Sequence, residues 1–363
     1  MSYLSRIAAT YMDTILSEEE LIYYAKHILL PGVGAIGQKK LKASRVLVVG
    51  AGGLGCPVLQ ALVGAGVGRV TIVDGDAVTL GNLPRQWLFD ANNIGVNKAR
   101  AAAEILMARN PFIQISAVEN PLHEVNAQTL IAEHDLVVDA TDELEARYLV
   151  DRVCADLDRP WIHGALYRDS GQVCVFWDHC GASYTQLYPE KSQAPDCASA
   201  GVLGATASMI GNMQAQEAIK LITGNALPSI GVIRVFNTVN FDLSEMTLPK
   251  IRLPALITAD LPEDHDYTIG WEQLEQRLSI GEPFRIIDLR SPKAFGEGHF
   301  SGAENSSIES ILGDLSKFDP SGNCIFYCEE GSLSGLLVNA LRSRGLKECF
   351  NLQGGYRIRT GSH

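Results

Sequence analysis

The sequence predicts an α/β protein in which a doubly wound, mostly parallel sheet is followed by a second and smaller α/β domain. Short aliphatic runs, such as residues 46–49, alternate with helical stretches, which is the pattern of parallel strands covered on both faces. A glycine-rich turn directly follows the first of these runs. Beyond a proline-rich stretch near residue 250, about 95 residues show the same alternation, which is enough for one small domain.

The N-terminal half supplies the elements of the larger sheet. Ser17 and Glu20 have the spacing of a capping box, in which each side chain bonds the backbone N–H of the other residue. The apolar stretch 21–30 follows, so we expect a helix there. Strands are predicted at residues 46–49, 70–73 and 136–138, and helices at residues 56–65 and 98–109.

After Trp161 the pattern changes. Strands of a different kind are predicted at residues 172–176 and 233–241, with a long buried helix at 205–222 between them. Three prolines and an acidic cluster predict an exposed linker at 248–267, which separates a first domain, residues 1–247, from a second, residues 268–363. In the second domain we expect strands at 284–288, 324–328 and 349–352 and a helix at 332–344.

Composition and charge exclude several classes of function. The net charge of −12 argues against non-specific nucleic-acid binding, which needs a positive surface to displace phosphate counterions. No apolar run approaches the roughly 18–20 residues that span a bilayer, and no secretory signal is evident, so we expect a cytoplasmic protein without a membrane segment. The eight cysteines form no C-x-x-C pair, which argues against a disulfide framework and a zinc site of that kind.

The glycine-rich turn carries the first functional signal. Gly50, Gly52 and Gly55 form the pattern G-x-G-x-x-G between a strand and a helix, with Gly53 inside it. Such a turn brings the backbone close to phosphate, and the N-terminus of the following helix attracts the anion. Asp74 ends the next strand, where a carboxylate can accept ribose hydroxyls. This pattern indicates a Rossmann-like nucleotide site, and at this point an NAD-dependent dehydrogenase remains open.

Three further motifs narrow the choice. The segment from Gly81 to Gln86, the segment from Gly95 to Lys98 and the run Ala140-Thr-Asp-Glu143 follow the glycine turn in this order. Together they resemble the ubiquitin-activating-enzyme-like adenylyltransferases, and most closely the MoeB-type and ThiF-type branch. The resemblance covers roughly residues 17–245.

That resemblance implies ATP, magnesium and a set of site residues. It makes Asp74 the ribose ligand and Asp142 the carboxylate that handles magnesium or the attacking C-terminus. Attack on the α-phosphate develops negative charge, which fixed cations and a metal stabilise. Further nucleotide ligands, several of which would also stabilise the leaving pyrophosphate, are Asn82, Arg85, Gln86 and Lys98, with Gly50, Gly52, Gly53 and Gly55 lining the phosphates.

The sequence departs from this family at several positions. Relatives have an arginine in the first helix that reaches ATP across a homodimer interface, and the matching residue here is Lys26, which lacks the bidentate fork. Relatives also carry two C-x-x-C pairs for a structural zinc, but residues 183–186 and 251–261 contain no cysteine. We therefore predict no zinc.

One cysteine falls in a family-specific loop. Cys197, within the segment from Asp196 to Gly201, matches a thiol that in some relatives forms a covalent link to the activated partner or its sulfur. The alternative is an inert loop cysteine, and the sequence leaves both open.

The C-terminal unit resembles a rhodanese domain over residues 268–357. The segments that carry this resemblance are 286–290, 298–303 and 354–356, and Cys328 occupies the strand-to-helix position of the reactive cysteine. The usual loop arginine is replaced by Leu333, and two glutamates follow the thiol, so we expect anionic donors such as thiosulfate to be repelled. A degenerate domain that serves only for docking is the alternative.

Together the two resemblances imply a two-step enzyme. The first domain would adenylate the C-terminal Gly-Gly carboxylate of a small ubiquitin-like sulfur carrier, and a persulfide on Cys328 would then supply the sulfur of a thiocarboxylate. A cysteine desulfurase or another persulfide donor would load Cys328, and a homodimer is expected. Adenylation of a peptide or small carboxylic acid, a non-enzymatic scaffold and a dehydrogenase remain as alternatives.

Overall fold

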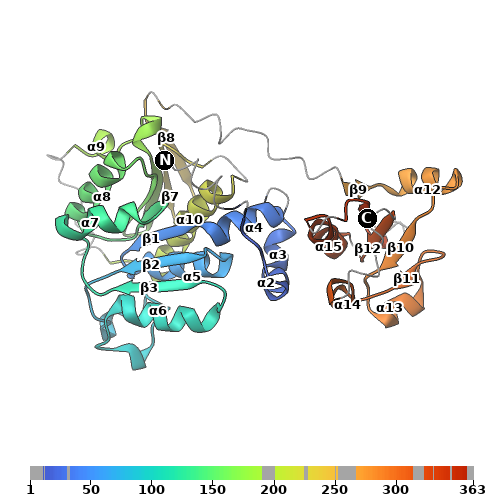
Figure 1. The fold of residues 1–363 in the computed structure, drawn as a ribbon. Helices are drawn as coiled ribbons and strands as arrows, with labels where there is room; N and C mark the ends of the chain where they lie inside the picture. The colour runs from blue at the N-terminus through green and yellow to red at the C-terminus, as the bar shows by residue number, and fades with distance from the viewer. Residues whose placement is uncertain are drawn as a thin grey trace. The chain divides into compact units, whose positions relative to one another are not determined.

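The computed structural model describes residues 11, 13–30, 33–189, 201–224, 228–249, 251, 267–313, 323–329, 331–343 and 346–357. These residues form two compact units, one around an eight-stranded sheet and one around a five-stranded sheet (Figure 1). Most of the predicted linker, residues 248–267, lies outside the described residues, so the domain boundaries remain predictions. Within the described part, no helix combines the length and the apolar character needed to cross a bilayer.

The N-terminal helices begin as the sequence predicts. Ser17 N donates to Glu20 Oε2 over 2.7 Å and Glu20 N donates to Ser17 Oγ over 3.2 Å, so the capping box is present. The single helix expected up to residue 30 is instead interrupted at Tyr24, which separates α2 (Glu18–Tyr23) from α3 (Ala25–Ile28). Helix α4 (Gly34–Ala43) then leads into the first strand.

The large sheet has the strand order β3-β2-β1-β4-β5-β6-β7-β8. Strands β1 to β5 are parallel, and β6 to β8 continue the sheet in antiparallel pairs. The chain reverses its direction of strand addition between β1 and β4, and ligands of open α/β sheets bind at this switch point. The strands are β1 (Arg45–Val49), β2 (Arg69–Val73), β3 (Gln114–Val118), β4 (Leu136–Asp139), β5 (Trp161–Tyr167), β6 (Ser170–Phe176), β7 (Val232–Asn237) and β8 (Leu243–Thr247).

Helices pack on this sheet through an aliphatic core. Strands β1, β2 and β4 are buried almost throughout, which explains their unbroken Val, Leu and Ile runs. The described helices are α5 (Gly55–Ala65), α6 (Lys98–Arg109), α7 (Glu124–Ala132), α8 (Leu144–Asp156), α9 (Tyr184–Leu187) and α10 (Gly204–Thr223), with short turns η1 (Leu80–Asn82), η2 (Ala91–Asn93) and η3 (Asp178–Cys180).

The long helix α10 lies directly on the β5–β6 hairpin. A Cβ added at Gly164 would lie 2.3 Å from Gln214 Cδ, and one at Gly171 would lie 2.2 Å from Ile210 Cγ1. Because these contacts leave no room for side chains, the two glycines hold the hairpin close against the helix.

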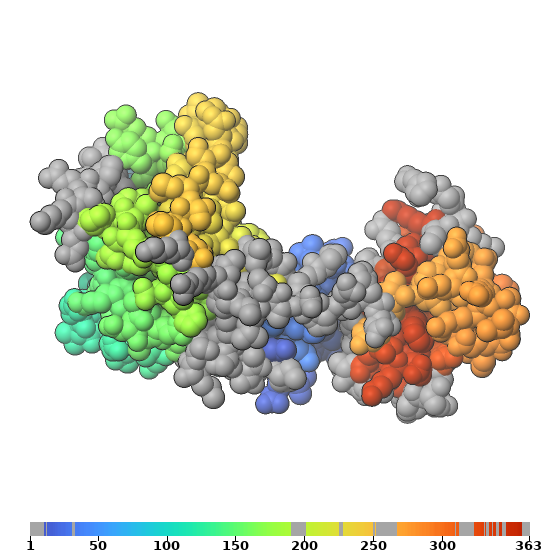
Figure 2. All heavy atoms as spheres, turned by 90° about the horizontal axis from the view of Figure 1, so that it is seen from above, coloured from blue at the N-terminus to red at the C-terminus, as the bar shows by residue number. Residues whose placement is uncertain are grey.

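The far edge of the sheet corrects one prediction. The strand expected at 233–241 ends at Asn237, because Asn237 N donates to Asp242 O in a turn where Phe241 has φ +61°. Strand β8 follows and is exposed along its whole length, and the yellow β7–β8 segment projects from the surface in Figure 2. No strand was predicted at β3 or β8, because their mixed, largely exposed residues lack a buried periodicity.

The small unit is an entirely parallel sheet with the order β11-β10-β12-β13-β9. Strand β12 lies near its centre, and Ile325, Phe326 and Tyr327 are fully buried there. The elements are β9 (Thr268–Ile269), α12 (Trp271–Ser279), β10 (Arg285–Asp288), α13 (Pro292–Glu297), β11 (Glu304–Asn305), α14 (Ile308–Gly313), β12 (Cys324–Tyr327), α15 (Ser332–Ser343) and β13 (Cys349–Leu352).

Candidate active site

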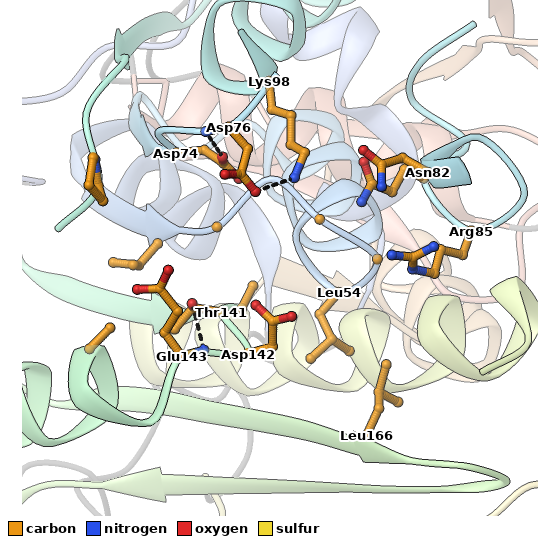
Figure 3. A pocket seen from close by; sticks show the side chains of 18 of the residues that line it. Leu54, Asp74, Asp76, Asn82, Arg85, Lys98, Thr141, Asp142, Glu143 and Leu166 are labelled. Atoms are coloured by element: carbon orange, nitrogen blue, oxygen red, sulfur yellow. Dashed lines mark hydrogen bonds and ion pairs between the residues drawn. The ribbon is translucent and has the colours of Figure 1, made fainter. Parts of the chain in front are cut away.

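A cavity of about 720 Å³ opens at the carboxyl ends of β1, β2 and β4, at the switch point of the large sheet (Figure 3). Most of the residues predicted from the sequence line it, although they come from separate segments of the chain. They are Gly50, Gly52, Gly53, Asp74, Asn82, Arg85, Gln86, Lys98 and Asp142. The volume and the polar lining suit a nucleotide.

The glycines of the turn have two different roles. A Cβ at Gly55 would lie 2.0 Å from Gly50 O, and one at Gly50, whose φ is +93°, would lie 2.8 Å from Ala140 O. These two glycines are required by packing. At Gly52 the nearest atom to an added Cβ is Gln86 Nε2 at 3.7 Å, and at Gly53 it is Ala207 Cβ at 3.4 Å. An added Cβ would therefore meet no protein atom too closely at Gly52 or Gly53, so packing does not require glycine there. The lack of a side chain at these two positions instead leaves space in the cavity.

Asp74 links the second strand to the glycine turn. Its Oδ2 accepts a hydrogen bond from Ala51 N over 2.7 Å, and its Oδ1 accepts one from Asp76 N over 2.9 Å. Burial raises the pKa of the Asp74 carboxyl. Each carboxylate oxygen keeps a second lone pair for a ligand hydroxyl. Asp74 therefore orders the turn as well as facing the cavity, a role that the sequence pattern did not indicate.

Lys98 starts helix α6 and is buried, with 7% of its surface exposed. Its Nζ donates to Asp76 Oδ2 over 2.7 Å (Figure 3). Asn97 fixes the helix start, because its Oδ1 accepts from Arg100 N and its Nδ2 donates to Asp74 O. The Lys98 ammonium group is therefore held at the cavity by its bond to Asp76 and by the helix start that Asn97 fixes. Asp76, its partner, was not predicted.

The segment after β2 presents three polar side chains. Asn82 Oδ1 accepts from Thr79 N over 3.1 Å, and Arg85 Nη1 donates to Gly81 O over 2.9 Å. Gln86 is only 2% exposed, and its Oε1 has no hydrogen-bond partner among the described residues. A buried amide without a partner costs roughly 1–3 kcal/mol. A polar ligand in the cavity would satisfy it, which is the observation that best fits a nucleotide here.

Asp142 lies in the loop that follows β4, and the buried Asp139 and Arg147 shape that loop. Asp139 Oδ1 accepts from Thr141 N over 3.1 Å. Arg147 Nη2 donates to Thr141 O over 2.8 Å, while its Nε lies 3.5 Å from Asp139 Oδ2. Asp139 and Arg147 together therefore hold the backbone N–H and the carbonyl oxygen of Thr141, the residue directly before Asp142. In Figure 3 Asp142 lies across the cavity from Lys98 and near Leu54.

A histidine extends this buried network. His163 Nδ1 lies 3.2 Å from Asp139 Oδ2, and His163 Nε2 lies 3.2 Å from Gln172 Nε2. Burial lowers the pKa of His163, so the imidazole is neutral, with Nδ1 donating and Nε2 accepting. Sequence reasoning missed Asp139, Arg147 and His163. For Asp139 and His163 the sequence did offer a signal, because each is a polar residue at the end of or within an otherwise apolar strand.

Two of the predicted residues, Gly55 and Lys26, do not line the cavity. Lys26 is exposed on α3 and does not line it. The family pattern assigns that position to a second protomer, so its role remains a prediction. Cys197 lies outside the described residues, and its role also remains a prediction. Sequence reasoning did not identify Thr141, Glu143, Arg147, Leu166 and Arg168 as lining residues.

Cys328 follows β12 in the small unit and precedes α15, as the sequence predicts. Its side chain is buried, and Ser334 Oγ lies 3.5 Å from its Sγ. A hydrogen bond joins Cys328 to the turn that follows β13, because Tyr356 N donates to Cys328 O over 2.9 Å. A Cβ at Gly355 would lie 2.4 Å from that same carbonyl oxygen, so the approach requires glycine.

Glu329, the first of the two glutamates after Cys328, is paired with two arginines. Glu329 Oε2 lies 3.6 Å from Arg290 Nη1, and Glu329 Oε1 lies 3.9 Å from Arg357 Nε. Arg290 is itself fixed by Asp288 over 2.7 Å and lies 3.6 Å above the Tyr356 ring. The two arginines therefore offset the charge of Glu329. Glu330 and the side chain of Leu333 lie outside the described residues.

Comparisons with known proteins identify a family for each of the two domains. Residues 24–255 match the ThiF family, and residues 271–357 match the rhodanese-like domain. A probable adenylyltransferase/sulfurtransferase MoeZ of Mycobacterium tuberculosis is 35% identical over 94% of this chain and 93% of its own. An adenylyltransferase and sulfurtransferase MOCS3 of Culex quinquefasciatus is 31% identical, covering 94% and 87%. A sulfur carrier protein adenylyltransferase of Thermus thermophilus is 39% identical over 64% of this chain and 89% of its own.

Solved structures support the fold. PaaA is similar with a TM-score of 0.57 at 21% identity, over 66% of this chain and 76% of that one. E. coli MccB with ATP gives a TM-score of 0.54 at 18% identity, over 69% and 87%. At such identities the likeness concerns the fold alone. The family match covers more than half of the chain, and relatives above 30% identity run along nearly all of it. The chain therefore belongs to the ThiF family, with a rhodanese-like domain after its ThiF domain.

Proposed function

We propose that this protein uses ATP to adenylate the C-terminal carboxylate of a small ubiquitin-like sulfur-carrier protein and then converts it to a thiocarboxylate. The observation that carries the proposal is one cavity that gathers the glycine turn, Arg85, Lys98 and Asp142. Relatives that share both domains along their length, MoeZ and MOCS3, are adenylyltransferases and sulfurtransferases by name. Adenylation of a peptide or small carboxylic acid is less favoured, because it leaves the rhodanese-like domain without a chemical role.

In the first step a carboxylate oxygen of the carrier attacks the α-phosphorus of ATP. The bond to the bridging oxygen breaks, pyrophosphate leaves, and an acyl adenylate forms. In this proposal Asp74 accepts the ribose hydroxyls, while Asn82, Arg85 and Lys98 bind the polyphosphate and stabilise the leaving group. Gln86 offers its buried amide to the nucleotide. Gly52 and Gly53 leave room for the phosphates.

Magnesium fits this site as a companion of the nucleotide. Among the described residues, no three metal-ligating side chains gather around one point. Magnesium is usually held by one or two carboxylates together with substrate phosphates, so Asp142 suffices on the protein side. When bound, it neutralises charge on the phosphates. The absence of a structural zinc stays a prediction.

In the second step a persulfide on Cys328 supplies sulfur. Its terminal sulfur attacks the acyl carbon, AMP leaves, and an acyl disulfide forms. Attack by a second thiol on Cys328 Sγ then releases the thiocarboxylate and leaves a disulfide, which a dithiol reductant reopens. For Cys197 the proposal keeps the role that the family resemblance implies, a covalent link to the activated partner or its sulfur. We further propose a cysteine desulfurase or similar persulfide donor, a homodimeric assembly and a cytoplasmic location.

The test uses the full chain with a ubiquitin-fold carrier protein from the same organism that ends in Gly-Gly. We expect ATP–pyrophosphate exchange that depends on the carrier, is lost in Asp142→Ala and persists in Cys328→Ala. Thiocarboxylate, detected by mass spectrometry, should require Cys328. As a matched control, Arg69→Gln changes an exposed residue at the start of β2 and should keep both activities. Exchange without carrier, or in Asp142→Ala, would refute the adenylation mechanism, and a fully active Cys328→Ala would reduce the second domain to docking.

A further inference from the structure

We propose that Arg168 binds the terminal carboxylate of the protein substrate and brings it to the nucleotide. This inference rests on the proposed function, and it concerns a residue that the sequence analysis did not assign to the site. The physical need is clear, because a carboxylate must approach a polyphosphate of the same sign. A cation that pairs with the carboxylate removes that repulsion.

Four cationic side chains line the cavity, and three of them have acceptors within the protein. Arg85 donates to Gly81 O, Lys98 donates to Asp76, and Arg147 donates to Thr141 O beside Asp139. Arg168 makes no hydrogen bond or ion pair with any described residue. Its guanidinium only lies over the neighbouring Tyr167 ring, 5.3 Å from the centroid. Its planar fork, which suits a carboxylate bidentately, is therefore available.

Arg168 stands on a fixed hairpin tip. It lies in the turn between β5 and β6 with φ +53°, a left-handed conformation that favours glycine. The next residue is anchored, because Asp169 O accepts from Thr238 N over 2.8 Å and from Thr238 Oγ1 over 2.9 Å. Thr206 Oγ1, near the start of α10, lies 3.1 Å from Thr238 Oγ1. The packed hairpin therefore holds the left-handed backbone of Arg168, which gives its side chain a fixed base at the cavity.

The position of the hairpin favours the carboxylate over the phosphates. Leu166, from the same hairpin, lies across the cavity from Lys98 and Asp74, with Asp142 between them (Figure 3). Lys98 and Asn82, two of the proposed phosphate ligands, lie on the opposite side of the cavity from Leu166 in Figure 3. Gly201 and Val202 line the same cavity as Leu166 and Arg168. A lining that includes such small and apolar residues suits a narrow Gly-Gly tail.

The experiment separates the two substrates. The full chain is assayed with the Gly-Gly carrier in its native acid form and as a C-terminal carboxamide, in the presence of a non-hydrolysable ATP analogue for binding. Arg168→Gln should raise KM for the carrier about 10-fold or more in pyrophosphate exchange, as expected for a lost charged hydrogen-bond pair, with KM for ATP within about twofold. In calorimetric titrations, wild type should prefer the acid form about 10-fold, and Arg168→Gln should bind acid and amide within about twofold.

Arg168→Gly tests the same idea against a purely structural role. It relieves the backbone conformation, so its unfolding temperature should equal or exceed that of wild type, while its kinetics match those of Arg168→Gln. Arg69→Gln carries the same change of net charge and should behave like wild type. The proposal is overturned if Arg168→Gln weakens ATP rather than the carrier, or if it still prefers the acid form. A wild type without exchange refutes the proposed function instead, and the acid-against-amide titration then still tests Arg168.

Discussion

The two kinds of glycine in the nucleotide turn can be separated by experiment. Gly55→Ala places a Cβ 2.0 Å from Gly50 O, which the backbone must move to accommodate. Overpacking of this kind costs about 3 kcal/mol. Since about 1 kcal/mol shifts the unfolding temperature of a domain of this size by roughly 2–4 °C, we expect a fall of about 6–12 °C.

Gly52→Ala should act on ligand binding instead. The nearest atom to its new Cβ is Gln86 Nε2 at 3.7 Å, so stability should change by no more than about 0.5 kcal/mol. ATP at about 100 times its Kd stabilises a wild-type site by about 2.7 kcal/mol, a rise of roughly 5–11 °C. If the methyl group weakens ATP 100-fold, only about 0.4 kcal/mol of that remains.

The assay is thermal unfolding of both variants with and without magnesium ATP. Wild type should shift upward with ATP, Gly55→Ala should start lower, and Gly52→Ala should match the apo wild type but lose the shift. The reasoning is refuted if Gly52→Ala is destabilised as strongly as Gly55→Ala, or if it keeps the full ATP shift.

Two further predictions concern the buried network behind Asp142. Asp139→Asn removes the charge that faces both Arg147 and His163, so it should destabilise the fold by about 3–5 kcal/mol in urea unfolding. As a control, Asp142→Asn at an exposed position should change the free energy of unfolding by less than about 0.5 kcal/mol. Equal effects of the two substitutions would contradict the proposed network. Because burial lowers the pKa of His163, the unfolded chain takes up its proton more readily, and stability should fall as pH drops below about 6.5. His163→Gln should make that fall less steep, and the contribution of His134, whose pKa burial also lowers, should remain. An unchanged slope would exclude His163 as a source.

The local sequence pattern was sufficient to predict which residues meet at the carboxyl ends of the parallel strands. Because β1, β2 and β4 are continuous apolar runs, the residues that follow them could be assigned to one edge, and Gly50, Asp74 and Asp142 indeed line one cavity. Arg147 and His163 escaped prediction because their partner Asp139 lies on a different element, and their pairing depends on burial that only the packed fold reveals.

Edge strands and turns were also difficult to predict, because they depend on contacts that the local sequence does not show. Strand β8 is exposed on both faces, so no apolar periodicity marks it, and β7 stops at Asn237 because of a turn rather than a change in composition. Likewise the pairing of Glu329 with Arg290 and Arg357 joins segments far apart in the chain, so the two glutamates could be noticed in the sequence but the ion pairs of Glu329 could not.

The mixed sheet separates the two sides of the cavity by their origin. The glycine turn and Asp142 come from its parallel half, and Arg168 comes from the first antiparallel hairpin. The ladder hydrogen bonds run between strand backbones, so side chains in the loops on either side can be replaced without disturbing the ladder. The hairpin tip is therefore the place at which to redesign the choice of acyl substrate while the nucleotide-facing loops keep their sequence.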